Sequence, residues 1–194
     1  MGVSQYISDL RSALAAVSAE ALMRVEEVLL RAWREQRLVF IAGNGGSAAT
    51  ASHWANDLNK GTAVPGQPRF RAVALTDSVP LMTAWANDVA YDSIFVEQLA
   101  NLCRPGDLLV VISGSGNSPN IVAAARWARE HGATVVGLTG GTGGQLRGLV
   151  DHCVLAPTHR MEQIEDVHLV VAHALCVALR ARIAAMTPVA TLER

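Results

Sequence analysis

The chain has 194 residues, enough for one full hydrophobic core but not for a second sizeable domain. Its formal net charge is −1 and its lysines and arginines do not cluster, which excludes the electrostatic footprint of a general nucleic-acid binder. An apolar content of 51% beside 17% charged residues fits a packed globule with apolar surface left for an oligomer interface. We therefore expect residues 1–194 to form a single domain with no nucleic-acid partner.

The N-terminus lacks the basic n-region and apolar h-region of a secretory leader. Tyr6 occupies the position where a myristoylation signal has Ser or Thr, and no uninterrupted apolar stretch is long enough to span a membrane. Cys103, Cys153 and Cys176 are an odd number in apolar surroundings, which indicates buried free thiols in a reducing compartment. These features predict a cytoplasmic protein with no membrane partner.

The N-terminal region, about residues 4–36, carries apolar residues at helical spacing. The pattern predicts either one long helix or a pair of helices. The residues that carry it are Ile7, Leu10, Leu14, Val17, Leu22, Val25, Val28, Leu29 and Trp33.

The central region, about residues 37–156, contains five short β-rich runs with helical patterns between most of them. Strands that alternate with helices are typical of a parallel sheet with crossover connections. The sequence therefore predicts an α/β fold with a doubly wound, parallel five-stranded sheet flanked by helices. The runs are 38–42, 72–75, 108–113, 135–139 and 153–156.

Two of these runs end in glycine- and serine-rich turns, 43–47 and 113–118, each followed by a helix-compatible sequence. Glycines let the backbone approach an anion, helix N-termini present unpaired N–H groups, and serines add hydroxyl donors. Neither turn carries Lys or Arg, and neither matches the P-loop or the dinucleotide fingerprint, so the turns indicate a monophosphate held by neutral donors. The alternative is two ordinary turns of an α/β sheet. The glycine run 140–144 lacks serines and is interpreted as a turn.

His53 and Asp57 follow the first turn at i and i+4, on one face of the predicted helix. An imidazole and a carboxylate so placed could ligate a metal ion or transfer a proton. The alternative is a solvated pair, or an aspartate that only holds a core histidine.

The C-terminal region, about residues 161–185, predicts a helix that is apolar on several faces, more than one sheet contact requires. With the N-terminal helix it predicts an intersubunit helical bundle. The acidic segment 162–166 in its first turns is explained by the helix dipole alone. His173 lies between Ala172 and Ala174 with no local partner, and the helical period selects Asp166 as its neighbour.

These sequence segments together resemble the sugar isomerase (SIS) domain family, and within it the phosphoheptose isomerases. Those enzymes convert sedoheptulose 7-phosphate to D-glycero-D-manno-heptose 7-phosphate. The resemblance runs through nearly the whole chain. The matching segments are 43–53, 76–77, 86–88, 105–107, 112–120, 138–140 and 163–173.

The resemblance implies catalysis by Asp57 and His173 through an enediolate, and a zinc ion bound by His53, Asp57, Glu165 and His173, as some members have. It also implies a homotetramer with active sites at subunit junctions, which agrees with the bundle-like terminal helices. The residues that it implies for binding the phosphosugar are Asn44, Gly45, Gly46, Ser47, Asp88, Ser113, Gly114, Ser115, Ser118, Glu162 and Glu165.

The chain departs from the family pattern at two site positions, because Asp57 and Glu165 stand where members commonly have Glu and Gln. An Arg that the family has shortly after the catalytic carboxylate is missing, with Lys60 in that region. A shorter carboxylate and an added anionic oxygen both suit a divalent cation. These departures from the family pattern leave open the alternative that the chain isomerises a different phosphosugar. A non-catalytic SIS module, in which the catalytic histidine is lost, is disfavoured by the presence of His173.

Overall fold

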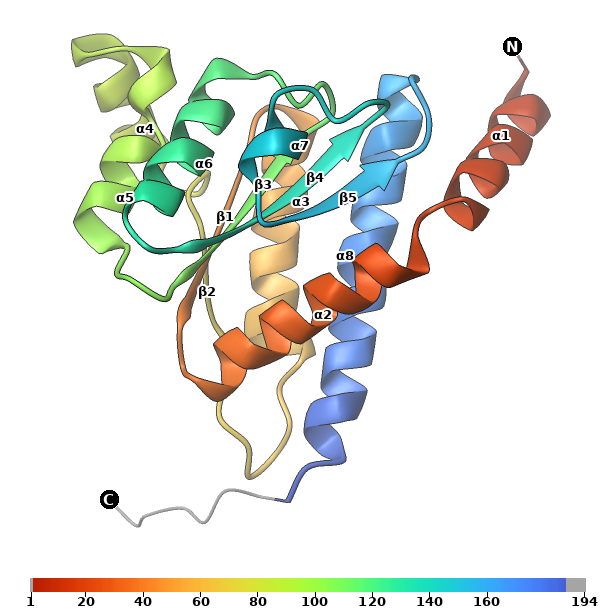
Figure 1. The fold of residues 1–194 in the computed structure, drawn as a ribbon, viewed down its shortest axis with the longest axis horizontal. Coiled ribbons are helices and arrows are strands. Elements are labelled where there is room, and N and C mark those ends of the chain that lie inside the picture. Colours follow the sequence, from red (N-terminus) through yellow and green to blue (C-terminus); the bar gives the residue numbers. More distant parts are fainter. Residues whose placement is uncertain (1, 188–194) are drawn as a thin grey trace.

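The computed structural model describes residues 2–187 as three layers, a five-stranded sheet with helices on both faces (Figure 1). The strands are β1 Leu38–Gly43, β2 Arg71–Ala74, β3 Leu108–Ser113, β4 Thr134–Gly140 and β5 His152–Ala156. The helices are α1 Val3–Ala15, α2 Ala19–Arg34, α3 Gly46–Asn56, α4 Val79–Asp88, α5 Val96–Leu102, α6 Pro119–Glu130, α7 Leu146–Leu149 and α8 Met161–Ala184.

All strand pairs are parallel, in the order β2-β1-β3-β4-β5. The five predicted runs become the five strands, shifted by at most one residue at either end. The chain moves outward from β1 to β2, returns to β3 on the other side of β1, and continues to β5. This order confirms the predicted doubly wound sheet and places its switch point between β1 and β3.

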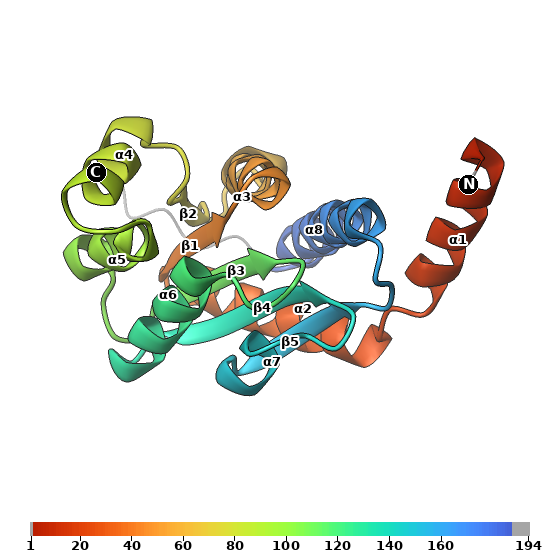
Figure 2. The same ribbon diagram turned by 90° about the horizontal axis from the view of Figure 1, so that it is seen from above.

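Successive side chains of each buried strand enter two different cores, because the side chains of a strand alternate between its faces. Val39 and Ile41 of β1 join the core beneath α2, α3 and α8, whereas Phe40 and Ala42 join the core beneath α5 and α6. Figure 2 shows α3 and α8 on one side of the sheet and α5 and α6 on the other. A sheet covered on both faces explains why β1 and β3 are continuous apolar runs.

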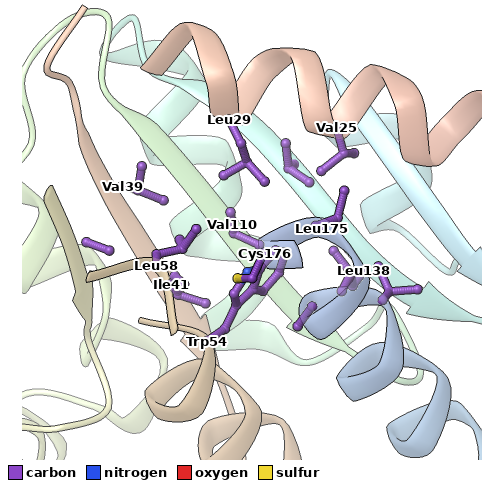
Figure 3. Close-up of a cluster of buried hydrophobic side chains, with 14 of the residues drawn as sticks. Val25, Leu29, Val39, Ile41, Trp54, Leu58, Val110, Leu138, Leu175 and Cys176 are labelled. Atoms are coloured by element: carbon purple, nitrogen blue, oxygen red, sulfur yellow. The ribbon is translucent and has the colours of Figure 1, made fainter. Parts of the chain in front are cut away.

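The larger core joins the sheet to the helix that follows the first glycine turn. Trp54 of α3 is fully buried and lies beside Cys176 of α8, with Leu29 of α2 above them (Figure 3). This packing fixes α3 against α8, so side chains on the outer faces of the two helices can meet. Cys176 is buried as predicted, whereas Cys103 and Cys153 are only half-buried, and all three are free thiols.

The N-terminal region is a pair of helices rather than one long helix. The chain breaks at Ser18, whose hydroxyl accepts a hydrogen bond from the Ala21 N–H at 3.2 Å and caps α2. α2 packs on the sheet, while α1 stands at the edge of the molecule and contacts α8 (Figure 2). Ala13 is the one buried residue of α1 in the described part of the chain.

The last helix agrees with the predicted span 161–185 to within one residue. By length and composition α8 could cross a membrane. Its inner face nevertheless belongs to the larger core, and its outer face carries His173. We therefore interpret α8 as a core helix that also presents a functional side chain.

Candidate active site at the sheet switch point

The two glycine- and serine-rich turns lie side by side at the carboxyl ends of β1 and β3. The register pairs Gly43 with Ile112, so each turn leaves its strand at the same level. Doubly wound sheets bind ligands in the crevice outside these strand ends, at the switch point. The fold thus brings together two segments that are about 70 residues apart in sequence, each leading into the N-terminus of a helix.

The first turn is shaped by glycines and lies against Glu165. Gly45 has φ of +53°, a conformation that side chains disfavour. A Cβ on Gly46 would lie 2.5 Å from the carboxylate oxygen Oε1 of Glu165, so the glycine leaves room for that side chain. Ser47 is buried in the first turn of α3. The absence of a side chain at position 46 therefore lets α8 place an acid beside the first turn.

The second turn is held by its own hydroxyls and by the glycine run after β4. The Oγ atoms of Ser113 and Ser118 are 3.1 Å apart, and the Asn117 N–H donates to Ser115 Oγ at 3.2 Å. Asn117 Oδ1 accepts a hydrogen bond from the Gln145 N–H at 3.0 Å. Gly140 ends β4, the rest of the run 140–144 forms the predicted turn, and Gln145 directly after it supports the serine turn through this bond.

A pair of asparagines joins the two turns. Asn44 Nδ2 donates to Asn120 Oδ1 at 2.8 Å, and Asn120 Nδ2 donates to Asn44 Oδ1 at 2.9 Å. The Tyr91 hydroxyl donates to the same Asn44 Oδ1 at 3.0 Å. Sequence reasoning missed Asn120 and Tyr91 as site residues, because nothing in their local sequence points to a partner 76 or 47 residues away.

His53, Asp57 and His173 converge on one point between α3 and α8. The two Nε2 atoms are 2.8 Å apart, and Asp57 Oδ2 lies 3.3 Å from His53 Nε2 and 3.6 Å from His173 Nε2. Both imidazoles are about half exposed, so the cluster is open to a ligand. The structure thus gives His173 the partners that its own helix does not provide.

Asp57 sits at a change of helix geometry. Its N–H still bonds to the His53 carbonyl, but residues Asp57–Gly61 form a π-helical turn in which the Thr62 N–H bonds to the Asp57 carbonyl. Such turns are frequent at functional sites. Asn59 anchors the turn to β2, since its amide donates to the Ala72 carbonyl at 2.8 Å and accepts from the Ala72 N–H at 3.1 Å. The spacing of His53 and Asp57 predicts their contact but not this turn.

The remaining predicted site residues lie apart from the three-residue cluster. Glu165 lies at the first turn on the same helix as His173, eight residues earlier, or about 12 Å along the axis. Asp88 is exposed at the end of α4 and accepts a hydrogen bond from the Asn87 amide at 2.8 Å. Asp166 is not the neighbour of His173, contrary to the helical-period prediction. It accepts a hydrogen bond from the Tyr6 hydroxyl and raises the pKa of Tyr6 to about 12.

The three converging residues fit a metal ion by donor type and spacing. Their ligand atoms all lie within 4.8 Å of one another. Tetrahedral ligands at 2.0–2.1 Å from zinc are about 3.4 Å apart, close to the three separations between His53, Asp57 and His173. Two imidazoles and a carboxylate are a normal donor set for zinc. Glu165 is outside this set within one protomer.

Comparison with known proteins identifies the family of the chain. The sequence matches the SIS domain model over residues 4–140. The phosphoheptose isomerase of Rhodospirillum rubrum is 39% identical over 158 residues, 81% of this chain and 84% of the relative. That of Mycobacterium bovis (strain BCG / Pasteur 1173P2) is 41% identical over 159 residues, 82% of this chain and 81% of the relative. The solved phosphoheptose isomerase of Neisseria gonorrhoeae superimposes with a TM-score of 0.86 at 31% identity, covering 92% of this chain and 97% of that chain. The chain therefore belongs to the SIS domain family and, within it, groups with the phosphoheptose isomerases.

Proposed function

We propose that this chain isomerises sedoheptulose 7-phosphate to D-glycero-D-manno-heptose 7-phosphate, with Asp57 and His173 as the catalytic pair. The family is one of aldose–ketose isomerases. The observation that carries the residue assignment is the convergence of Asp57, His53 and His173, at separations of 2.8 to 3.6 Å, between α8 and the end of the helix that leaves the first glycine turn. One helix thus links an anion-binding turn to an acid–base cluster.

Isomerisation next to a carbonyl requires a base for the C–H proton, stabilisation of the enediolate, and an acid for the neighbouring carbon. Asp57 Oδ2 faces the two histidines, whereas Oδ1 has a single long contact, 3.4 Å from the Asn56 amide. Asp57 Oδ1 is therefore the proton acceptor in this proposal. His173, whose Nε2 lies 2.8 Å from that of His53, is the acid–base partner that returns a proton to the substrate.

The distance between the serine turns and the acid–base cluster supports a phosphosugar with a long carbon chain. His53 follows Gly46 by seven residues, which corresponds to about 10 Å along the axis of α3. A substrate whose phosphate occupies the serine turns has to extend over that length to reach the acid–base cluster. A heptose 7-phosphate, with its phosphate at the end of the chain remote from the carbonyl, has this shape.

We further propose that His53, Asp57 and His173 would hold zinc, with Glu165 of another subunit completing the ligand set. With zinc on its Nε2, His173 would act as a ligand, and the enediolate's own oxygens would carry the proton that it otherwise returns. A zinc ion held by these residues would supply Lewis-acid polarisation of the substrate oxygens. Glu165 adds a negative charge where the family commonly has the neutral amide of Gln, and Asp57 keeps the charge of the family's Glu, so the pair favours a divalent cation.

The active assembly in this proposal is a homotetramer in the cytoplasm, formed by a single SIS domain from each chain. Val170 and Val177 lie three residues before and four residues after His173 on α8, and they are 44% and 60% exposed. An exposed apolar stripe beside a catalytic residue supports a site at a subunit junction. The three free thiols support a reducing compartment.

Two alternatives keep the fold but change the role. An isomerase of a different phosphosugar would use the same cluster, and the substitutions at positions 57 and 165 are the observation that favours it. A non-catalytic phosphosugar-binding or scaffold protein would need the turns alone. The presence of His173 in contact with His53 and Asp57 argues for chemistry rather than binding.

The test measures zinc content and sedoheptulose 7-phosphate turnover in the same samples, before and after chelation. Asp57→Asn keeps the shape of the side chain and removes the base, so we expect kcat to fall by roughly 10² to 10⁴ while phosphosugar binding persists. Glu130→Gln, at the exposed end of α6, is the control and should leave kcat unchanged.

Each outcome separates the alternatives. Stoichiometric zinc with chelation-sensitive turnover supports the metal-dependent isomerase. Bound zinc without turnover points to another phosphosugar, and absence of both favours the scaffold role. Unchanged turnover in Asp57→Asn would remove Asp57 from the base role.

A further inference from the structure

Two asparagine side chains that hydrogen-bond reciprocally to each other connect the two serine turns. Asn44 directly follows β1, and Asn120 is the second residue of α6. Each amide donates one hydrogen bond to the other, and Asn120 Oδ1 also accepts from the Ile121 N–H at 2.9 Å. The pair therefore connects the start of the first serine turn to the helix that follows the second.

Burial makes this pair unusually constrained. Asn120 is 1% exposed, so water does not compete for its amide. A buried polar group that loses its partner retains its desolvation cost, and a reciprocal pair therefore favours one separation of its two backbones. Asn44 Oδ1 is further held by the Tyr91 hydroxyl on the exposed side. Both carbonyl oxygens of the pair thus have two donors each.

The phosphate contacts that the family resemblance implies for Ser47, Ser113 and Ser118 depend on that separation. Ser47 is on one side of the switch point, and Ser113 and Ser118, whose Oγ atoms are 3.1 Å apart, are on the other. A single phosphate can accept from both sides only while the two turns keep their distance. Asn120 itself is buried and takes no part in the acid–base cluster.

We propose that Asn120 is a positioning residue for the substrate phosphate, acting through Asn44 to fix the spacing of the two serine turns. This inference rests on the proposed phosphate site. It assigns Asn120 to phosphate affinity and not to proton transfer, so its loss raises KM and leaves kcat largely intact.

The first test uses Asn120→Asp, which keeps the shape but turns one donor into an anionic oxygen facing Asn44 Oδ1. We expect the Kd of inorganic phosphate and the KM of the phosphosugar to rise roughly ten-fold or more, with kcat changed much less. Asn101→Asp, on the exposed side of α5, makes the same charge change as a control and should leave both constants unchanged.

The second test separates positioning from folding. Asn120→Leu alone leaves Asn44 without its partner, so both thermal stability and phosphate affinity should fall. Combining it with Asn44→Leu removes both amides, which restores much of the stability because no amide is left unpaired. Phosphate affinity should stay low in the double variant, since the turns remain unconnected.

The outcomes distinguish this inference from the phosphate site itself. If Ser113→Ala weakens phosphate binding but Asn120→Asp does not, the turns bind phosphate and the positioning role is wrong. Recovery of phosphate affinity together with stability in the double variant would also overturn it. If neither Ser47→Ala nor Ser113→Ala affects phosphate binding, the proposed site and the positioning role both fail.

Discussion

His168 and His173 show how the environment divides histidines of one helix into different roles. His173 is half exposed against His53 and Asp57. His168 is fully buried, and its Nε2 lies 3.1 Å from the Thr139 carbonyl oxygen, which accepts a hydrogen bond from it. Its Nδ1 has no hydrogen-bond partner in the described chain. Burial disfavours the imidazolium and lowers the pKa of His168 to about 4.

The lowered pKa of His168 predicts a loss of stability in mild acid. The unfolded chain binds a proton at its ordinary pKa near 6.5, whereas the folded chain does not until about pH 4. The free energy of unfolding is therefore unaffected by His168 above pH 6.5. It falls by up to about 3 kcal/mol as the pH is lowered towards 4, because only the unfolded chain then binds the proton. Urea unfolding between pH 7 and 4.5 measures it.

A matched pair of variants isolates this contribution. His168→Gln does not titrate, so its free energy of unfolding should vary less with pH than that of the parent. His131→Gln, on the exposed side of Trp127, should keep the parent's pH dependence. An unchanged pH dependence in His168→Gln would show that other groups cause the acid loss.

At the scale of single residues, the sequence predicts which side chains carry chemistry better than it predicts which residues they contact. Residue types and spacing were enough to single out His53, Asp57 and His173, because two of them share a helical face and the third has no local partner. The same helical geometry selected Asp166 for His173 and was wrong, since Tyr6 of α1 accounts for that carboxylate. The partners of His173 lie 116 and 120 residues away, a distance that no local pattern encodes.

Among the elements, the π-helical turn after α3 determines where Asp57 lies. Asn59 is its link to β2, through two hydrogen bonds with the Ala72 backbone. We predict that Asn59→Ala costs about 1 to 2 kcal/mol, because both hydrogen bonds are lost together. It should also lower kcat more than it raises KM, since the turn that carries Asp57 is released. Steady-state kinetics and urea unfolding measure the two effects.

The neighbouring Lys60 provides the control for Asn59. Its side chain is exposed, and Lys60→Ala should change stability by less than about 0.5 kcal/mol. If Asn59→Ala loses stability but keeps the kcat of the parent, the position of Asp57 does not depend on this anchor.

Elements with strong local patterns were predictable, and elements defined by long-range contacts were not. The strands β1 and β3 were evident because a sheet covered on both faces needs continuous apolar runs. The segment 79–93 gave no such signal, since α4 buries none of its residues in the described chain and Tyr91 acts through Asn44. Its place at the site depends on the sheet order, which brings distant turns together.

At the scale of the whole molecule, the exposed apolar stripe on α8 connects assembly to catalysis. Val177 is 60% exposed in the isolated protomer, so Val177→Asp should leave the subunit folded. In the proposed tetramer the new carboxylate would be buried without a partner, a cost of several kcal/mol. We predict that Val177→Asp sediments as a smaller species at micromolar concentration and loses turnover in parallel.

Leu102→Asp tests whether the position matters or only the charge. Leu102 is 48% exposed at the end of α5, away from α8, and its variant should keep the assembly and turnover of the parent. Dissociation of Val177→Asp with turnover retained would mean that each protomer holds a complete site. An unchanged assembly would place the interface elsewhere. Loss of assembly and turnover together is expected if the partner subunit completes the site beside His173.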